Sequence, residues 1–281
     1  MEASSLFFFL FTTSLLLVGT SDQTVFNVLD YGAVGDGQTD DTNAFARAWQ
    51  ETCASSSSAT VQVPSGKTFL IRALRFNGPC NSNSVSMEID GNLMAPSDPS
   101  KWDCENNVCD RWIYFHRVDG LTVRGYGTID GRGDKWWHGD ALEISSSNNI
   151  YLGGGLNFKD SPRMHVVLNG LRSLVVSDIT IDAPEKSPNT DGIHVTGCTN
   201  AFINHSRIGT GDDCISIVDG SSFVTITNII CGPGHGISIG SLGKNGANDE
   251  VEYISVSDVV FIGSTNGARI KTWQVNYATI R

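Results

Sequence analysis

The sequence predicts an all-β chain wound into a solenoid, a parallel β-helix with a capping helix near its N-terminal end. One reason is a fixed period, because Ile193, Ile215 and Ile237 follow one another at a constant 22-residue spacing. A period in the twenties is typical of solenoids, in which each repeat forms one coil. A second strand candidate, 202–208, precedes another at 223–230 by a step of 21 or 22 in the numbering. Two strand tracks with one period are what a parallel β-helix requires.

The composition favours many short strands over helices. The 281 residues include 30 glycines, and only 17% are charged. Short runs of Val and Ile alternate with Gly, Asn or Asp, which is the pattern of strands joined by tight turns. The strand candidates are residues 61–63, 69–72, 85–89, 113–115, 121–124, 150–152, 165–168, 174–181, 193–195, 202–208, 215–218, 223–230, 237–239, 253–261 and 269–271. We therefore expect residues 22–281 to form a single β-helix domain.

An amphipathic helix is expected before the first coils. Asp40 or Asp41 can cap it, and it should run to about Cys53. The apolar positions at helical spacing are Ala44, Phe45, Ala48, Trp49 and Cys53. A solenoid needs such a lid over an open end. The Gly- and Asp-rich segment 30–37 before the helix is interpreted as a tight turn, since its spacing is not that of an EF-hand calcium loop.

Residues 1–21 are interpreted as a secretory signal peptide. A mostly apolar run of 13 residues, 6–18, is followed by the small residues Gly19, Thr20 and Ser21, as before a cleavage site. A membrane anchor is the alternative, but the run is shorter than the ~20 apolar residues that span a bilayer. We therefore expect a secreted, extracellular protein that is not attached to a membrane after cleavage.

Secretion makes disulfides possible, and the chain has seven cysteines. The candidate pairs are Cys104 with Cys109, Cys53 with Cys80, and Cys214 with Cys231. The first would close a small loop, the second would tie the helix to the first coils, and the third would clamp two polar motifs together. The odd count leaves Cys198, which we interpret as a buried thiol rather than a nucleophile.

The charge distribution restricts the partners. A formal net charge of −11 speaks against nucleic acid and provides no long-range attraction to an anionic polysaccharide. An anionic substrate would need local cations, of which Arg269 and Lys271 are the notable pair. No His or Cys spacing fits a zinc site. Asn204, in an Asn-His-Ser sequon, is the glycosylation candidate, which would place it at the surface.

Three aspartates and a histidine are expected to meet on one face of the solenoid. Asp191, Asp213 and His235 repeat the 22-residue period, which stacks them on neighbouring strands about 4.8 Å apart. Asp212 directly precedes Asp213, and adjacent residues of a regular strand face opposite sides. The backbone must therefore turn here if both carboxylates are to reach one ligand, and the glycines before them would allow such a turn.

The cluster has the groups that glycoside hydrolysis needs. One protonated carboxyl must protonate the leaving oxygen, and a carboxylate must activate water or attack the sugar. Crowded carboxylates raise one another's pKa, which helps to keep one of them protonated. Arg269 and Lys271 share a strand face and could pair with a sugar carboxylate, and the polar segment 244–250 should form a loop at the cleft edge. Each motif alone is weak evidence for a catalytic function. The alternative is a repeat scaffold whose polar turns have no catalytic role.

Together these motifs resemble the polygalacturonases of glycoside hydrolase family 28, and look most like those of plants. The shared motifs are Asn189-Thr190-Asp191, Gly211-Asp212-Asp213, Gly234-His235-Gly236 and Arg269-Ile270-Lys271. The segments 26–41 and 127–133 also look like the family. The resemblance covers residues 25 to 273 and implies a right-handed parallel β-helix.

The resemblance also implies a reaction, the inverting hydrolysis of α-1,4 bonds in the polygalacturonate of pectin, without a metal or an organic cofactor. The implied roles are general acid for Asp212, water activation for Asp191 with Asp213, assistance to the acid for His235, and substrate binding for Asn189, Arg269 and Lys271. An enzyme of this kind would act in the plant cell wall, and we expect it to be a monomer.

After Gln274 the sequence departs from the family, which usually continues with a Gly-rich turn and several more coils. The chain stops at Arg281, so we expect C-terminal coils to be missing and the last coil to expose its apolar interior. A tyrosine that the family contributes from later coils is not assigned to Tyr277. The alternatives are a truncated pectin-binding or misfolded remnant, and a β-helical enzyme similar to the calcium-dependent pectate lyases.

Overall fold

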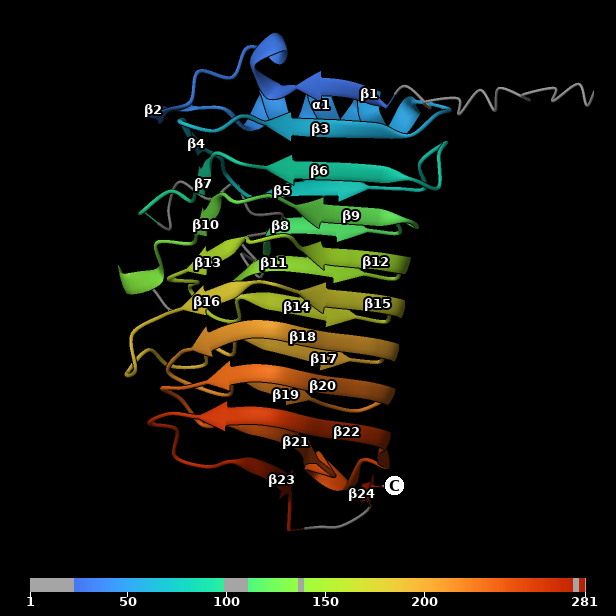
Figure 1. The fold of residues 1–281 in the computed structure, drawn as a ribbon, viewed down its shortest axis with the longest axis vertical. Coiled ribbons are helices and arrows are strands. Elements are labelled where there is room, and N and C mark those ends of the chain that lie inside the picture. The colour runs from blue at the N-terminus through green and yellow to red at the C-terminus, as the bar shows by residue number, and fades with distance from the viewer. Residues whose placement is uncertain (1–22, 99–110, 136–138, 275–277, 281) are drawn as a thin grey trace, which may run out of the picture.

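The structure is a stack of parallel coils that runs from the N-terminal helix to the last strands (Figure 1). This computed structural model describes residues 23–98, 111–135, 139–274 and 278–280. Every strand pair in the described part of the chain is parallel. Each coil therefore adds strands to the edges of the same sheets, and the expected parallel β-solenoid is confirmed.

Three tracks of strands form the walls of the solenoid. The eight-stranded sheet, counted over the described residues, contains β5 (Leu74–Asn77), β8 (Arg111–His116), β11 (Asp140–Ser145), β14 (Val166–Asn169), β17 (Ile193–Thr196), β19 (Ile215–Ile217), β21 (Ile237–Leu242) and β23 (Ala268–Thr272). The first track contains β1 (Thr24–Asn27), β3 (Ala59–Val63), β6 (Val85–Ile89), β9 (Leu121–Arg124), β12 (Asn148–Gly153), β15 (Arg172–Ser177), β18 (Thr199–Gly209), β20 (Ser221–Cys231), β22 (Asp249–Phe261) and β24 (Ala278–Ile280). The second track contains β2 (Asp36–Asp40), β4 (Thr68–Leu70), β7 (Asn92–Met94), β10 (Thr128–Asp130), β13 (Asn157–Lys159) and β16 (Thr180–Asp182), and it joins the first at β18.

The register of the eight-stranded sheet confirms the 22-residue period. Ile193 pairs with Ile215, and Ile215 pairs with Ile237. The first track differs, because Ala201 pairs with Val224. That pairing is a step of 23 in the numbering, and the expected step of 21 or 22 was wrong there. The register shows that the path from β19 to β20 gains one residue over the path from β17 to β18, and that the path on to β21 then loses one. The eight-stranded sheet therefore keeps its 22-residue step although the first track has a step of 23 here.

The following coil is longer than those before it. Ile237 pairs with Ala268, a step of 31 in the numbering. Most of the added length lies between Ile239 and Val251, a segment that includes the 3-10 helix η5 (Lys244–Gly246). This segment is eight residues longer than its counterpart between Ile217 and Ser221 in the preceding coil (12 steps in the numbering against 4). The expected loop over 244–250 therefore ends early, since β22 already begins at Asp249.

Apolar side chains of successive strands stack inside the solenoid. One column in the eight-stranded sheet consists of Leu142, Val166, Ile193, Ile215 and Ile237, none more than 1% exposed. Fully burying a Leu, Ile or Val side chain contributes about 1.5–3 kcal/mol, so each coil extends one continuous core. Alternate residues of the same strands point outward, and these positions hold the polar groups of the site.

The helix α1 (Thr42–Ala54) lies at the N-terminal end of the stack, where a lid was expected (Figure 1). Its buried residues are Ala44, Phe45, Ala48, Trp49 and Thr52. Thr52 takes the buried place that we expected for Cys53, which is only half-buried. The ring of Trp49 packs edge-on against Phe76 of β5, with 5.2 Å between the ring centroids, so the lid is joined to the core of the first coils.

The capping of α1 differs from the expectation. Asp41 stands at the N-cap position, but its side chain forms no cap hydrogen bond. It instead accepts the backbone N–H groups of Val34 at 2.7 Å and Gly35 at 3.1 Å. Asp40 accepts the N–H of Thr42 at 3.1 Å. The buried carboxylate of Asp41 thus stabilises the preceding turn, because the turn's N–H groups would otherwise lack partners.

Two of the three expected disulfides are present in the described residues. They are Cys53–Cys80, which ties the end of α1 to the segment after β5, and Cys214–Cys231, which joins the loop before β19 to the end of β20. The third pair, Cys104 with Cys109, and the signal peptide at residues 1–21 lie outside the described residues. Cys198 is free and buried, and burial raises the pKa of its thiol to about 11, as expected of a thiol that is not a nucleophile.

The glycosylation candidate is not at the surface. Asn204 of β18 is 6% exposed, and its Oδ1 lies 3.0 Å from His205 Nδ1. A glycan is bulky and needs an Asn side chain that reaches solvent. The surface position that the sequon suggested was therefore wrong.

The last coils expose apolar side chains of a kind that earlier coils bury. Val256 is 36% exposed, although its register partner Ile226 is 0% exposed. Ile270 is 57% exposed and pairs with the half-buried Ile239. The expected exposure of the coil interior at this end is therefore present.

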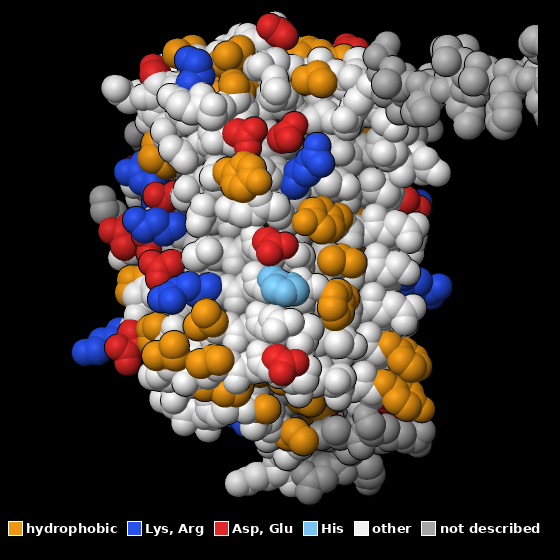
Figure 2. All heavy atoms as spheres, viewed as in Figure 1, with side chains coloured by type: hydrophobic (Ala, Val, Ile, Leu, Met, Phe, Trp, Pro, Cys, Tyr) orange, Lys and Arg blue, Asp and Glu red, His pale blue; other side chains and the backbone are white. Residues whose placement is uncertain are grey.

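The outer surface of the first track has a mixed character. On the face drawn in Figure 2, Lys and Arg side chains lie among Asp and Glu side chains and do not gather into one basic area. Apolar side chains on this face occur in small groups. Over the described ranges, no helix has both the length and the apolar character that crossing a membrane requires.

Candidate active site

The loops before β17, β19 and β21 bring the polar motifs to one edge of the eight-stranded sheet. Asp191, Asp213 and His235 each lie two residues before the first residue of a strand. The loops continue the pairing of the strands, because the N–H of Gly192 donates to the carbonyl of Asp213 at 2.9 Å. The period that aligns the isoleucines therefore also aligns these three polar positions.

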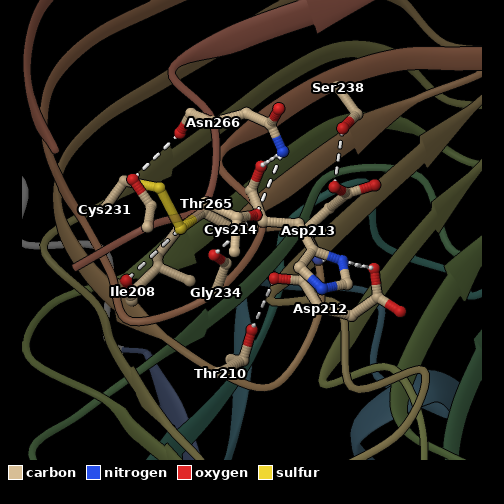
Figure 3. The surroundings of a disulfide bond; sticks show 12 residues. Ile208, Thr210, Asp212, Asp213, Cys214, Cys231, Gly234, Ser238, Thr265 and Asn266 are labelled. Atoms are coloured by element: carbon tan, nitrogen blue, oxygen red, sulfur yellow. Dashed lines mark hydrogen bonds and ion pairs between the residues drawn. A yellow bond between two sulfur atoms is a disulfide. The ribbon is translucent and has the colours of Figure 1, made fainter. Parts of the chain in front are cut away.

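A backbone turn brings Asp212 to the same place as Asp213 (Figure 3). A Cβ atom on Gly211 would lie 2.0 Å from the carbonyl oxygen of Ser187, so this turn requires glycine. The N–H of His235 donates to the carbonyl of Asp212 at 2.8 Å. One ligand atom from each of Asp212, Asp213 and His235 lies within 4.8 Å of the others, and the three side chains thus converge.

Asp213 is a buried carboxylate that holds two cations. Its side chain is 1% exposed. Its Oδ1 accepts from Ser238 Oγ at 2.6 Å and from Arg269 Nη2 at 2.8 Å, and its Oδ2 accepts from Lys271 Nζ at 2.6 Å. A carboxylate whose oxygens only accept, two of the bonds coming from cations, is ionised. Arg269 and Lys271, singled out for a substrate carboxylate, therefore also neutralise a carboxylate of the protein.

Asp191 is the second buried carboxylate. Its Oδ2 accepts from Ser216 Oγ at 2.6 Å, and its Oδ1 has no hydrogen bond with any described residue. His194 Nδ1 lies 2.7 Å from Ser216 Oγ and 3.6 Å from Asp191 Oδ2. Burial alone would raise the pKa of Asp191. The nearby His194, the hydrogen bond from Ser216 and the charge of Lys271 outweigh burial, and the pKa is lowered.

Asp212 differs from the other two carboxylates. Its side chain is 23% exposed, and its Oδ1 accepts the N–H of Asp213 at 2.9 Å and His235 Nδ1 at 2.9 Å. Its Oδ2 has no hydrogen-bond partner among the described residues. His235 is more open, with 40% of its side chain exposed. One oxygen of Asp212 is thus held in place while the other remains free to carry a proton.

The residues just before Asp191 shape the rim of the site. Asn189 is exposed and has a φ of +54°, a conformation that Asn tolerates better than most residues. Thr190 is fully buried, and its Oγ1 lies 2.6 Å from Ser187 Oγ and accepts the N–H of Gly211 at 3.1 Å. Thr190 therefore ties the first motif to the second, and Asn189 is left at the surface.

Three polar residues that the sequence analysis did not single out belong to the site. They are His194, Ser216 and Ser238, which pair in register with one another and, through Ser238, with Arg269. The signal that would have found them was available, since 194, 216 and 238 repeat the 22-residue period three residues after Asp191, Asp213 and His235.

Asp212, Asp213 and His235 are residue types that also occur in cation sites. Hard cations bind carboxylate oxygens that are free to coordinate. Both oxygens of Asp213 are already bonded to Arg269 and Lys271. The arrangement therefore suits proton transfer better than cation binding.

A second polar cluster lies on the same sheet, nearer the N-terminal end. The Tyr114 ring has the guanidinium groups of Arg75 and Arg111 at 4.9 and 4.8 Å from its centroid. Arg111 forms an ion pair with Glu143, which is 2% exposed, and burial raises the pKa of Asp140 to about 6. The sequence analysis missed this cluster, because its members stand on strands whose spacing departs from the 22-residue period.

Known proteins with similar sequences are glycoside hydrolases, which agrees with a cluster of carboxylates suited to proton transfer. The family model of glycosyl hydrolases family 28 matches residues 53–281, and a model described as rhamnogalacturonase A/epimerase, pectate lyase-like, matches residues 25–77. A probable polygalacturonase of Arabidopsis thaliana is 44% identical over 94% of this chain. The chain spans 58% of the length of that relative.

Solved structures with similar folds include two proteins whose names describe enzymes that act on galacturonate polysaccharides. An endo-xylogalacturonan hydrolase from Aspergillus tubingensis has a TM-score of 0.79 and 30% identity, over 92% of this chain and 71% of that chain. A polygalacturonase from Erwinia carotovora has a TM-score of 0.75 and 24% identity, over 92% and 76%, and this second likeness concerns the fold alone. With a family model matched from Cys53 to Arg281, across every residue of the site, the chain belongs to glycosyl hydrolases family 28.

Proposed function

We propose that the chain hydrolyses the α-1,4-galacturonosyl bonds of pectin and polygalacturonate with inversion. One observation carries the proposal, namely that the environments of the three carboxylates differ. Asp213 holds two cations, Asp191 holds a serine and a histidine, and Asp212 has a free oxygen. Different environments are what divide acid and base roles among carboxylates. The family and the 44% identity with a probable polygalacturonase support the substrate class.

Asp212 is the general acid in this proposal. Its free Oδ2 carries the proton that passes to the glycosidic oxygen as the bond breaks. His235 Nδ1 and the N–H of Asp213 both donate to Oδ1. They fix the direction of the carboxyl group and stabilise the carboxylate that remains after proton transfer.

Asp191 and Asp213 activate the water in this proposal. Both are buried and accept strong hydrogen bonds, which support their ionised forms. Asp191 Oδ1 is free to accept a proton from water. Attack from the face opposite the departing oxygen inverts the anomeric centre. Inverting enzymes usually hold the acid and the base carboxylate about 6.5–9.5 Å apart. Asp213 has an oxygen within 4.8 Å of one of Asp212, so Asp191 takes the proton in this proposal and Asp213 helps to hold the water.

Arg269 and Lys271 bind the galacturonate carboxylate. Their side chains are 29% and 28% exposed, so neither is closed off by its bond to Asp213. Arg269 uses Nε for Ser238 and Nη2 for Asp213, which leaves Nη1 for an anionic sugar. Asn189, exposed at the rim, supplies an amide to the same sugar.

We further propose that the protein is secreted and acts in the plant cell wall. The two disulfides support an oxidising, extracellular environment. The 44% identity with a probable polygalacturonase of Arabidopsis thaliana supports a plant polygalacturonate as the substrate.

The test is the release of reducing ends from polygalacturonate by the purified chain in the presence of EDTA, beside Asp212→Asn. We expect reducing ends without ultraviolet absorbance from unsaturated products, and a loss of about 100-fold or more in the variant. Growing absorbance would identify a lyase instead. Folded, soluble protein that binds polygalacturonate but releases no reducing ends would identify an inactive binding remnant.

A further inference from the structure

A column of polar side chains runs along the outside of the eight-stranded sheet beside the carboxylates. This polar column consists of His194, Ser216, Ser238 and Arg269, in register on β17, β19, β21 and β23. Each serine donates to an aspartate that stands 25 residues before it, Ser216 to Asp191 and Ser238 to Asp213, and both distances are 2.6 Å. The same contact thus occurs in two successive coils.

The ends of the polar column differ in chemistry. Arg269 Nε donates to Ser238 Oγ at 2.8 Å, and His194 Nδ1 lies 2.7 Å from Ser216 Oγ. Ser238, which bonds to Asp213, therefore contacts a permanent cation. Ser216, which bonds to Asp191, contacts an imidazole instead.

The protons of these groups fix the direction of the bonds. A serine hydroxyl has one proton, and an ionised carboxylate can only accept. Because Ser216 gives its proton to Asp191, its oxygen must accept from His194. His194 Nδ1 therefore carries a proton, and two hydrogen bonds run in the same direction from His194 through Ser216 to Asp191.

The surroundings strengthen this chain of bonds. Ser216 is 2% exposed and Asp191 is 8% exposed, and hydrogen bonds are stronger electrostatically in a buried environment. A buried carboxylate without donors would take up a proton more readily, since burial raises the pKa of Asp191 and its donors lower it.

We propose that His194 and Ser216 are positioning residues for Asp191, and that their successive hydrogen bonds hold its carboxylate ionised and oriented for water activation. The inference deepens the proposed hydrolase function and rests on it. Arg269 and Ser238 do the same for Asp213 with a cation that never titrates.

The charged groups around His194 come from several elements. Asp191 lies on the loop before β17, the strand that carries His194. Asp140, at the start of β11, interacts electrostatically with His194. Lys271 of β23 acts on Asp191. The register neighbours of His194 on β14 and β19 are Val167 and Ser216, which carry no charge.

The first test does not depend on activity. The titration of the Asp191 carboxyl is followed by carbon-13 NMR in the full chain, with Asp191→Asn for assignment. His194→Phe and Ser216→Ala should each move the midpoint to higher pH, because each removes a donor that favours the ionised form. His194→Asn should restore the wild-type midpoint, since the Asn amide donates from nearly the position of Nδ1.

The second test uses kinetics on polygalacturonate. His194→Phe should lower kcat about 10- to 100-fold, the effect of a lost hydrogen bond to a charged group, with little change in KM. The acid limb of kcat/KM should move to higher pH. Because Ser216 carries the hydrogen bond from His194 on to Asp191, the double variant should lose less activity than the product of the two single losses. His205→Phe, on an exposed position of β18, is the matched control and should behave as wild type.

The outcomes separate this inference from the proposed function. An unchanged Asp191 midpoint in His194→Phe overturns the inference, whatever the activity. Loss of stability and activity without a shift in the midpoint or the acid limb indicates a structural role and also overturns it. A folded wild-type chain that releases no reducing ends contradicts the proposed function instead.

Discussion

Lys271 Nζ lies 2.6 Å from Asp213 Oδ2, a carboxylate whose side chain is 1% exposed. From the sequence, this lysine was predicted to bind a substrate carboxylate, because it shares a strand face with Arg269. In the folded chain it also neutralises a buried charge. Lys271 therefore contributes to the stability of the fold as well as to the proposed binding of galacturonate.

Replacing this lysine should destabilise the protein. Lys271→Met should lower the free energy of unfolding by about 1.5–3 kcal/mol, the range for a hydrogen bond to a charged group, and thermal unfolding at pH 7 measures the change. Asp213→Asn in the same chain should recover part of the loss, because the buried charge is then absent. Lys159→Met, which breaks an exposed ion pair to Asp160, should cost at most about 1 kcal/mol. Equal stability of the Lys271 and Lys159 variants would contradict the prediction.

His165 is a fully buried histidine whose ring nitrogens are both satisfied in the neutral form. Its Nδ1 lies 3.1 Å from the carbonyl oxygen of Asp191, to which it donates, and its Nε2 accepts the N–H of Ser161 at 3.3 Å. A second ring proton would point at that N–H. Burial accordingly lowers the pKa of His165 to about 4.

Acid should therefore weaken the fold through His165. The unfolded chain protonates this histidine near pH 6.5, whereas the folded chain does so only near pH 4. Between these values the unfolded state binds more protons, so stability falls as the pH falls, by about 3 kcal/mol in total. Urea unfolding at pH 7 and pH 4.5 should show a smaller pH effect in His165→Gln than in wild type. The exposed His205→Gln should keep the wild-type effect, and the same effect in all three proteins would exclude this source of acid sensitivity.

The two disulfides offer a matched comparison, because one lies at the site (Figure 3) and the other at the N-terminal end. Replacing either pair by Ala should cost about 2–4 kcal/mol. Only the loss of Cys214–Cys231 should also lower kcat, since Cys214 follows Asp213 directly and its N–H donates to the carbonyl of Gly236. Melting temperatures and initial rates of both double variants test this, and an equal fall in kcat for the Cys53–Cys80 variant would argue against it.

The architecture could be predicted because a solenoid relates neighbouring strands by a fixed step in sequence. Ile193, Ile215 and Ile237 show that step directly, and their register follows it. The first track was misjudged by one or two residues, because a turn can absorb an additional residue without changing which side chains face the core. The N-cap position of Asp41 was predicted, but its hydrogen-bond partners were not, since its side chain bonds to the N–H groups of a preceding turn.

The members of the site could be predicted better than their contacts. The period placed Asp191, Asp213 and His235 together, and the glycine before Asp212 indicated the turn. A strand pattern reports which face a residue occupies, but not which partner it meets on another strand. The bonds of Lys271 to Asp213 and of Ser216 to Asp191 needed the coordinates for that reason.

The position of Asp212 depends on Gly211, so this glycine allows a test of the turn itself. A Cβ atom there would lie 2.0 Å from the carbonyl oxygen and 2.7 Å from the N atom of Ser187, so Gly211→Ala must displace the loop. A misplacement of about 1 Å can cost about 100-fold in rate, and we expect such a fall in kcat with an unchanged far-ultraviolet circular dichroism spectrum. Gly267→Ala is the matched control, because its Cβ would meet only the Phe261 ring at 3.8 Å. If both variants retained the same activity, the acid would not depend on the turn, and the role proposed for Asp212 would lose its structural basis.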